Sequence, residues 1–519
     1  MAKILVDINV ILDAVLNRDE ISSALLDKLA DSYHELFVTA SMVAVLDYFL
    51  NKYNANKKEF KKKFFSRFKV ITTTGMDALN ALSFEDGEDA LISLSFKRVA
   101  KDGLIITKDR KFPSNGLSVL TPEEALYNQE LFGQEENKTI SLLDLQKEYR
   151  HLMEEIDDVI LKCASGGKYI LGSEVSEFEQ KLANYIGVKH AIGVSSGTDA
   201  LVLSLRALAI KLKGKEYWDK EDLVITTPLT FTATGEAILR AGATPLFVDI
   251  TLDTFNLDPE EVEKTLEKYE NRVVGILPVH LYGHPCDMDR IMRLARGAGI
   301  FVVEDCAQSL GARWNGKQTG SFGDAGCFSF FPTKPLGGFG DGGMIVTDDD
   351  ELADIIKMLR THGGRDKNRP EHIGYNARLD TLQAAILLTR LKYLNEFTEK
   401  RRKIAEFYHK KLKGIDWLVL PVEHEKAFHV YHQYTVRVRG RNRDDVREGL
   451  REKGVHTMVY YPVPLHRMEV FRRTRMEIFG SLKNAETVSK SVLSLPIEPL
   501  YFERKDILEK VVSAFLECE

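Results

Sequence analysis

Residues 326–343 read GCFSFFPTKPLGGFGDGG, a short apolar run followed by one lysine and a glycine-rich loop. The apolar run predicts a buried strand, which places Lys334 at the strand's carboxyl end. A lysine with apolar neighbours can have its pKa lowered enough to act as a nucleophilic amine. A lysine before a loop is more often simply solvated, so the interpretation depends on what lies on either side of this stretch.

Two stretches upstream support a cofactor site. SSGTDAL (195–201) follows an apolar run and opens a helix, whose free backbone amides attract an anion. In VVEDCAQSLGA (302–312), Asp305 ends an apolar run, where a carboxylate needs a cationic partner such as a protonated ring nitrogen. An ordinary helix cap and an Arg or Lys partner are the alternatives for each stretch alone. Together with Lys334, the two stretches form the set that pyridoxal phosphate requires.

Apolar strands alternate with helical stretches throughout this part of the chain. This alternation is typical of an α/β fold with a largely parallel sheet that is covered on both faces. The strands are expected at 190–194, 223–227, 244–250, 273–279 and 299–306.

From Ile140 to Glu519, the chain resembles the DegT/DnrJ-type sugar aminotransferases, which are fold type I pyridoxal-phosphate enzymes. The matching stretches are GKYILGSEVSEFEQKLANYIGVKHAIGVSSGTDAL, TFTATGEAI, PVHLYGHPCDMDRI, VEDCAQSLGA, SFFPTK, GYNARLD and YYPVPLH. The resemblance implies a large cofactor-binding domain at 140–390, with a mainly parallel sheet, and a smaller C-terminal α/β domain at 391–519.

The resemblance also implies roles for single residues. Lys334 would bind the cofactor covalently and then move protons between the substrate carbon and the cofactor. Asp305 would pair with the pyridinium nitrogen. The other contacts would be Gln308 near the ring hydroxyl, Phe231 on the ring face, and Gly197, Thr198 and Ser329 at the phosphate. Asn376 would reach the phosphate of the neighbouring subunit's cofactor, which implies a homodimer with shared sites.

The substrate contacts implied by the resemblance are His280, Tyr461 and His466, facing the sugar or the donor carboxylate. For each histidine taken alone, a structural role is the alternative. The family often has His where this chain has Tyr460, so contacts there would differ. The segment KLKGKEYWDKED (211–222) looks like an insertion, and its charge predicts a surface excursion.

The implied reaction moves an amino group from glutamate to a keto group on a nucleotide-linked sugar, in amino-sugar or surface-polysaccharide biosynthesis. Donor and acceptor would use one site in alternation, which gives ping-pong kinetics. Three alternatives stay open. They are a cofactor-dependent sugar dehydratase, whose members typically carry His in place of the lysine; a ribonuclease with the large domain as scaffold; and a regulator that only binds the cofactor.

The polar stretch NQELFGQEENKT (128–139) marks a linker at 129–139, preceded by a smaller α/β domain at 1–128. Apolar strands expected at 3–6 and 104–107 are followed by Asp7 and Asp109, and a helical pattern at 88–100 begins with Glu88-Asp89. Carboxylates at the ends of parallel strands converge in one crevice and suit Mg²⁺ or Mn²⁺. Such a site permits metal-assisted phosphodiester hydrolysis.

Four short segments of this domain resemble a PIN domain, the fold of many toxin-type ribonucleases. They are VDINVILD (6–13), EDAL (88–91), IITKD (105–109) and VLTPEEAL (119–126). The resemblance implies Asp7, Asp89 and Asp109 as metal ligands and RNA as a partner. The family usually has a further acid where this chain has Val45, so a domain kept for binding or assembly is the alternative.

The composition predicts a cytoplasmic protein. The formal net charge of −6 argues against nucleic-acid binding through bulk positive charge, and the basic run NKKEFKKKFF (56–65) fits the solvated face of a helix. The five cysteines are scattered without zinc spacing, which indicates reduced thiols. No apolar run reaches the ~18 residues of a membrane span, so no membrane contact is expected.

Overall fold

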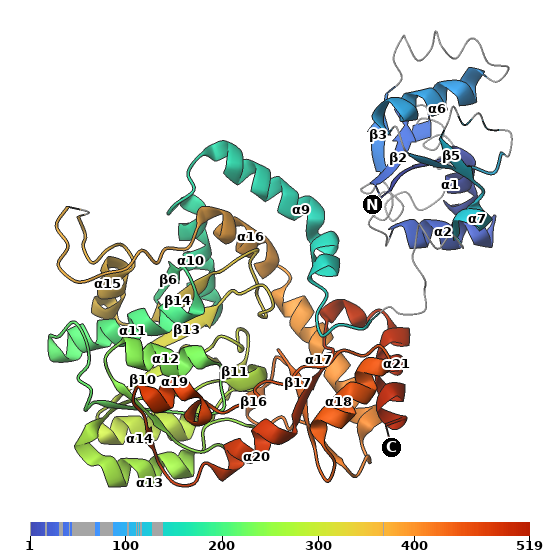
Figure 1. Ribbon diagram of the computed structural model, residues 1–519. Helices are drawn as coiled ribbons and strands as arrows, with labels where there is room; N and C mark the ends of the chain where they lie inside the picture. The colour runs from blue at the N-terminus through green and yellow to red at the C-terminus, as the bar shows by residue number, and fades with distance from the viewer. Residues whose placement is uncertain are drawn as a thin grey trace. The chain divides into compact units, whose positions relative to one another are not determined.

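The computed structural model divides the chain into two compact units, Met1–Lys138 and Thr139–Glu519 (Figure 1). The described residues are 2–15, 18–30, 35–40, 42–43, 68–72, 87–100, 103–109, 112, 114, 117–126, 139–366 and 368–518. Val45, the basic run at 56–65 and residues 129–138 of the expected linker lie outside them. Each unit has its own hydrophobic core.

The N-terminal unit is built on a five-stranded parallel sheet in the order β3-β2-β1-β4-β5. Its strands are β1 (Lys3–Val6), β2 (Glu35–Thr39), β3 (Phe68–Ile71), β4 (Leu104–Ile106) and β5 (Ser118–Leu120). Its described helices are α1 (Ile8–Val15), α2 (Glu20–Ala30), α6 (Gly87–Val99) and α7 (Pro122–Leu126). The predicted strands at 3–6 and 104–107 and the predicted helix at 88–100 agree with β1, β4 and α6 to within one residue.

The second unit contains an eight-stranded sheet in the order β18-β8-β7-β9-β10-β13-β14-β6. Its strands are β6 (His190–Val194), β7 (Leu223–Thr226), β8 (Thr244–Phe247), β9 (Val273–Leu277), β10 (Phe301–Asp305), β13 (Ala325–Ser329), β14 (Gly343–Thr347) and β18 (Glu477–Ile478). Only β14 runs against its neighbours. The α/β fold with a mainly parallel sheet is confirmed, and each of the five predicted strands contains an observed one.

Helix α11 (Gly197–Lys213) lies at the centre of this unit. Residues 200–209 of the helix are all buried, which explains why its sequence is apolar on almost every side. The helix packs against β13, β14, α12 (Thr232–Arg240) and α15 (Asp350–Leu359). Its first turn is thereby held at the edge of the sheet where several strands end. The other helices before residue 392 are α9 (Leu145–Gly166), α10 (Ser173–Ile186), α13 (Pro259–Tyr269), α14 (Met288–Ala298) and α16 (Thr381–Leu391).

The C-terminal part forms a smaller layer of sheet and helix. Its antiparallel sheet has the order β15-β17-β19, with β15 (Leu418–Val419), β17 (Tyr434–Val438) and β19 (Val492–Leu495). The helices of this part are α17 (Leu394–Leu412), α18 (Arg443–Glu452), α19 (Glu469–Arg473), α20 (Lys483–Ser491) and α21 (Lys505–Leu516). A further antiparallel sheet joins β12 (Lys317–Gln318), β11 (Arg313–Trp314) and β16 (Ala427–Phe428).

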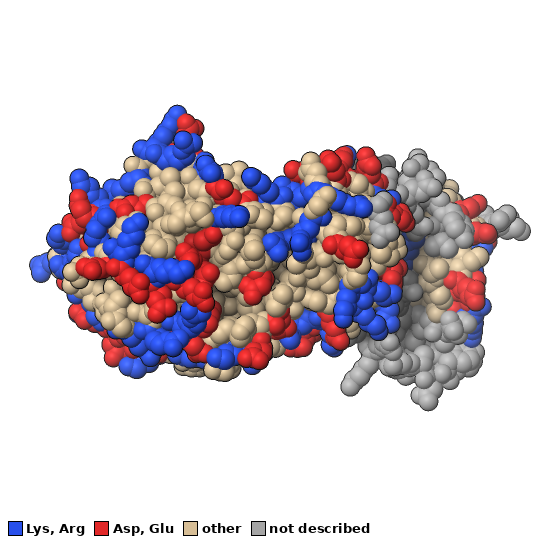
Figure 2. Space-filling model, turned by 90° about the horizontal axis from the view of Figure 1, so that it is seen from below, with Lys and Arg blue, Asp and Glu red and all other residues tan. Residues whose placement is uncertain are grey.

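The surface carries both signs of charge. Figure 2 shows basic and acidic side chains intermixed over the visible face. Among the described helices, none has the length and apolarity that crossing a membrane would require.

Candidate active site

The pairing of neighbouring strands brings three predicted cofactor contacts to one edge of the large sheet. Ser329 pairs with Gly343, which in turn pairs with Val194. Ser329 and Asp305 are the last residues of β13 and β10, and Gly197 opens α11 three residues after β6 ends. Because β6, β10 and β13 run in the same direction, these residues lie at the carboxyl edge of the sheet, where α/β proteins bind ligands.

The turn that opens α11 has no room for a side chain. A Cβ atom on Gly197 would lie 2.7 Å from the Cβ of Ser329. Ser196 caps the helix, because its hydroxyl accepts a hydrogen bond from the backbone amide of Asp199 at 3.0 Å. The amides of the first turn form the positive end of the helix. Gly197, Thr198 and Ser329 therefore surround one corner that suits a phosphate.

Lys334 lies in a tight loop after β13. Its backbone amide donates to the carbonyl of Phe331 at 2.8 Å. A Cβ on Gly337 would lie 2.2 Å from the carbonyl oxygen of Pro332, so the loop closes only with glycine there. Burial of the amine lowers the pKa of Lys334 to about 8, and the attraction of Asp305 opposes that shift. An amine with this pKa is partly neutral near physiological pH, as a nucleophile has to be.

Asp305 is a buried carboxylate, 5% exposed, close enough to Lys334 for the two to affect each other's titration. Its Oδ2 accepts a hydrogen bond from the Thr234 hydroxyl at 2.8 Å, and its Oδ1 accepts one from the amide of Ala307 at 3.1 Å. Burial raises the pKa of Asp305, and these hydrogen bonds only partly offset the effect. A cationic hydrogen-bond donor would strongly stabilise the ionised form of this buried carboxylate.

The Gln308 side chain joins two tyrosines. Its oxygen accepts from the backbone amide of Tyr282 at 2.7 Å, and its nitrogen donates to the hydroxyl of Tyr461 at 3.1 Å. The ring of Phe231 lies 6.1 Å from that of Tyr461 and is tilted by 41°. Phe231 is 56% exposed. The structure thus brings Gln308, Tyr461 and Phe231 together, with more than half of the Phe231 surface exposed.

His280 lies away from any surface that a substrate could reach. Its side chain is fully buried, and its Nε2 lies 3.0 Å from Oε2 of Glu304. Its Nδ1 accepts from the backbone amide of Cys286 at 3.0 Å, so both ring nitrogens are engaged. The backbone amide of His280 donates to the carbonyl of Asp305 at 3.1 Å. In this structure His280 supports the strand end that carries Asp305.

His466 and Asn376 lie in different settings. His466, in the short helix η5 (Leu465–Arg467), is 5% exposed, and its Nε2 lies 3.0 Å from Oε1 of Glu486. Its Nδ1 has no hydrogen-bond partner among the described residues. Asn376 is exposed and forms a bridge with Thr361. His466 therefore keeps one uncommitted ring nitrogen, and Asn376 lies at the surface of its own chain.

Thr107 joins two of the three aspartates predicted as metal ligands in the N-terminal unit. Its hydroxyl donates to Oδ2 of Asp7 at 2.8 Å and accepts from the amide of Asp109 at 3.1 Å. Asp89 lies on α6. Within the described residues, these three side chains do not gather their carboxylate oxygens within 4.8 Å of one another. The arrangement does not support the predicted Mg²⁺ or Mn²⁺.

The side chains of His280, Glu304 and Cys306 do gather within 4.8 Å. Glu304 is fully buried and accepts from the ring of His280. It also accepts from the backbone amides of Gly320, Phe322 and Gly323. Because the oxygens of Glu304 already have these donors, the cluster is a structural hydrogen-bond centre and not a metal site.

Sequence reasoning missed Thr234 and Tyr282. The hydroxyls of Thr230, just before the cap of α12, and Thr234, in its first turn, lie 3.0 Å apart, and their spacing of four positions was a usable signal. Tyr282 has a positive φ of 58° and meets Gln308, which is 26 positions away. No local sequence pattern predicts the contact between Tyr282 and Gln308.

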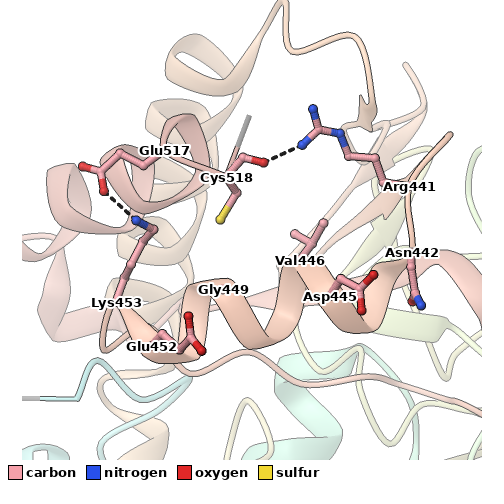
Figure 3. A pocket seen from close by; sticks show the side chains of 9 residues that line it. All are labelled: Arg441, Asn442, Asp445, Val446, Gly449, Glu452, Lys453, Glu517 and Cys518. Carbon is pink, nitrogen blue, oxygen red and sulfur yellow. Dashed lines mark hydrogen bonds and ion pairs between the residues drawn. The ribbon is translucent and has the colours of Figure 1, made fainter.

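A separate pocket of about 790 Å³ lies between α18 and α21 (Figure 3). Its lining includes two cations, Lys453 and Arg441. Lys453 pairs with Glu517 at 2.7 Å, and Arg441 donates to the carbonyl of Cys518. The pocket holds none of the predicted site residues, and its cations are already engaged.

Comparisons with known proteins agree with this geometry. Residues 150–515 match the DegT/DnrJ/EryC1/StrS aminotransferase family. The chain is 42% identical over 380 residues to the pleiotropic regulatory protein of Geobacillus stearothermophilus, covering 72% of this chain and 98% of that protein. It is 41% identical over 364 residues to the UDP-N-acetyl-3-dehydro-α-D-glucosamine 3-aminotransferase of Acidithiobacillus ferrooxidans, covering 70% and 94%.

Among solved structures, the second unit resembles that of S. venezuelae DesV in complex with a ketimine intermediate. The TM-score is 0.68 at 40% sequence identity, and the match covers 73% of this chain and 98% of that chain. The family match spans more than half of the chain, and the relatives are covered almost end to end. This chain belongs to the DegT/DnrJ/EryC1/StrS aminotransferase family.

Proposed function

We propose that the protein is a pyridoxal-phosphate-dependent aminotransferase that moves an amino group from glutamate to the keto group of a nucleotide-linked sugar. The observation that carries the proposal is that Lys334, whose pKa burial lowers to about 8, lies close enough to the buried carboxylate of Asp305 to be attracted by it. The family membership and the name of the UDP-sugar aminotransferase relative support the reaction class. Amino-sugar or surface-polysaccharide biosynthesis would use such a product.

The residues present fit this cofactor. The corner formed by Gly197, Thr198 and Ser329 would hold its phosphate, because a Cβ on Gly197 would fill that corner. Asp305 already has one donor on each oxygen and would accept a third from the ring nitrogen. When bound, pyridoxal phosphate supplies an electron sink that stabilises negative charge at the substrate carbon.

Lys334 and Asp305 would divide the proton chemistry. Once displaced by the amino donor, the Nζ of Lys334 would take a proton from one carbon and return it to another, which requires a pKa near the working pH. Asp305 would keep a proton on the ring nitrogen. Gln308 would orient Tyr461 through their 3.1 Å hydrogen bond, and the exposed face of Phe231 would stack on the ring.

We assign the substrate contacts to Tyr461 and His466. The Nδ1 of His466 is buried without a hydrogen-bond partner among the described residues, which favours a ligand contact. His280 supports Asp305 instead, since both of its ring nitrogens are engaged.

We also propose a homodimer with shared sites, with the large domain at 140–390 and the small domain at 391–519. Several aromatic side chains near the site segments remain exposed in the single chain, which suits burial against a second copy. They are Tyr169 at 56%, Phe331 at 49% and Phe339 at 42% exposed. Asn376 would reach the cofactor phosphate of the partner subunit.

The test supplies glutamate together with a panel of nucleotide-linked ketosugars and follows 2-oxoglutarate. The purified protein should be yellow, and borohydride should attach the cofactor to Lys334. Lys334→Ala should abolish turnover, while Lys220→Ala, an exposed lysine at 74%, should leave it unchanged. A colourless protein that takes up no pyridoxal phosphate would remove the proposal. Cofactor binding without 2-oxoglutarate from any sugar would favour a regulator instead.

A second candidate function concerns the N-terminal unit, for which we propose a PIN-like domain at residues 1–128. Asp7 and Asp109 follow the adjacent parallel strands β1 and β4 and are linked through Thr107, so they lie at one edge of the sheet, as a nuclease acting on RNA would require. To bind Mg²⁺ or Mn²⁺, Asp7, Asp89 and Asp109 would have to move closer together, since their carboxylate oxygens do not gather within 4.8 Å of one another in the structure. RNA cleavage that requires Mn²⁺ and disappears in Asp7→Asn would support it. Absence of cleavage by the full chain would favour a binding or assembly role.

A further inference from the structure

Arg206 on α11 is a fully buried arginine that joins two separate segments. Its Nη2 donates to Oε2 of Glu216 at 2.8 Å and to the carbonyl of Ile373 at 3.0 Å. Its Nη1 donates to the hydroxyl of Tyr375 at 2.9 Å. The guanidinium also lies 3.8 Å from the ring centroid of Tyr217. Arg206 is thus the common partner of the segments 211–222 and 371–376.

Glu216, in the segment 211–222, also contacts the segment 371–376 directly. Its Oε1 lies 2.8 Å from Nδ1 of His372, and its Oε2 accepts from the backbone amide of Ile373 at 3.2 Å. Both oxygens of one carboxylate therefore hold the segment 371–376, and one of them also neutralises the buried charge of Arg206.

Trp218 anchors the segment 211–222 to the core of the unit. Trp218 is 5% exposed, and its ring centroid lies 5.2 Å from that of Phe301. Its Nε1 donates to the carbonyl of Leu205 at 2.7 Å. The charged segment lies mostly at the surface, as predicted, and Trp218 anchors it to the body of the unit.

The segment 371–376 closes onto the chain just before Asn376. A Cβ on Gly374 would lie 2.0 Å from the backbone nitrogen of Gly363, and one on Gly363, whose φ is +87°, would lie 1.8 Å from the carbonyl oxygen of His372. The amide of Tyr375 donates to the carbonyl of Leu359 at 2.7 Å. With its ends packed so tightly, a shift of this segment would move Asn376 with it.

We propose that Arg206 and Glu216 are positioning residues of the active site, which hold the segment 371–376 so that Asn376 is presented to a second copy of the chain. The inference rests on the proposed function, in which Asn376 acts in the partner's site. Its physical basis is that a buried guanidinium without its carboxylate is strongly unfavourable, so the charge pair fixes both segments in one arrangement.

The first test is hydrogen exchange of the full chain without added cofactor. Glu216→Gln keeps the shape of the side chain and removes its charge. The amides of residues 372–377 should exchange at least tenfold faster in this variant, since the charged acceptor that holds the segment becomes neutral. Glu221→Gln, a neighbouring glutamate that is 67% exposed, is the control and should show no change. Unchanged protection in Glu216→Gln would overturn the anchoring role.

The second test uses two mixed dimers that carry the same two substitutions. In the first, Lys334→Ala lies on one chain and Glu216→Gln on the other. Its surviving site then receives Asn376 from the chain with an intact Glu216, so about half of the wild-type activity is expected. In the second, both substitutions share one chain, and its surviving site receives the displaced Asn376. Its activity should be lower by tenfold or more, because small misplacements of contact groups have large effects on rate.

Equal activities of the two mixed dimers, or a lower activity of the first, would contradict positioning across the dimer. A wild-type protein without any transaminase activity would refute the proposed function alone. The hydrogen-exchange result would still decide whether Glu216 anchors the segment.

Discussion

Lys334 and Asp305 show how one environment acts on two charges of opposite sign. Burial disfavours the charged form of each, so it lowers the pKa of the amine to about 8 and raises the pKa of the carboxylate. Their mutual attraction opposes both shifts but does not cancel them. The amine is therefore partly neutral near physiological pH, and the carboxylate would be stabilised by the cationic ring nitrogen of the proposed cofactor.

The pKa of Lys334 predicts how capture of pyridoxal phosphate by the cofactor-free protein depends on pH. The neutral amine reacts, and its fraction should rise roughly tenfold between pH 7 and pH 9 and then level off for a pKa of about 8. An ordinary lysine, with a pKa near 10.4, would instead rise about a hundredfold over this range without levelling. Stopped-flow absorbance measures the rate, with a lysine peptide as control. A hundredfold rise would show that burial does not tune this amine.

Thr234 predicts a second effect at this scale. Thr234→Val keeps the shape of the side chain but removes the 2.8 Å hydrogen bond to Asp305. Turnover should fall at least tenfold, since a hydrogen bond to a charged group is worth about 1.5–3 kcal/mol. The pH at which the bound cofactor changes its absorbance should also shift. Thr234→Ser should restore both, and Thr487→Val, at an exposed threonine of α20, should change neither. An unaltered absorbance profile in Thr234→Val would argue against this role.

At the scale of elements, the start of α11 and the end of β13 define the anion corner together. Neither element forms a binding site alone, since capped helix starts and serines at strand ends are both common. The order β13-β14-β6 sets them side by side, and the glycine at the helix start permits the close approach. The helix itself cannot shift, because residues 200–209 are buried on all sides.

Gly197→Ala tests this corner. The added methyl would lie 2.7 Å from the Cβ of Ser329, so either the helix start or the strand end has to move. We expect pyridoxal phosphate to bind about 5- to 150-fold more weakly, measured by equilibrium dialysis, because overpacking a tight contact costs about 1–3 kcal/mol. Gly166→Ala is the matched control, because nothing lies within 4 Å of a Cβ on that glycine. Equal affinity in both variants would show that the corner does not hold the phosphate.

At the scale of the whole molecule, the chain consists of two units with separate cores. One core is assembled from residues Ile4 to Ala125, and the others are assembled from residues from Ile140 onward. The family match lies entirely within the second unit. A unit that buries its own apolar residues is expected to fold alone.

We therefore predict that a chain beginning at Thr139 folds and takes up pyridoxal phosphate with the affinity of the full chain. Its kcat/KM for the sugar substrate should agree within about twofold, since the proposed site residues all lie in this unit. Sedimentation shows whether the shortened chain folds without aggregating, and turnover assays give its kcat/KM. An aggregated or inactive product would mean that the N-terminal unit contributes to the fold or the site, and a Lys334→Ala version controls for contaminating activity.

Much of the fold was predictable from local pattern. The strands β6 to β10 fall within the predicted ranges, because apolar runs bounded by polar turns are a local property of the chain. The single reversed strand β14 and the edge strand β18 were not predicted, since strand order and direction depend on pairing between distant segments. Thr234 could have been found from its spacing to Thr230, whereas Tyr282 could not.

The amino-acid sequence by itself determined the family of this protein and its candidate cofactor residues. Lys334, Asp305 and the SSGTDAL turn are recognisable because the residues that prepare each one are its neighbours in the chain. Only the tertiary structure decided what the distant pairs do. His280 and His466 look equivalent in sequence, yet the first has both ring nitrogens engaged and the second has one uncommitted. The charged segment 211–222 likewise contacts the segment 371–376 through Arg206 and Glu216. Burial and pairing between distant segments are not local properties of a chain.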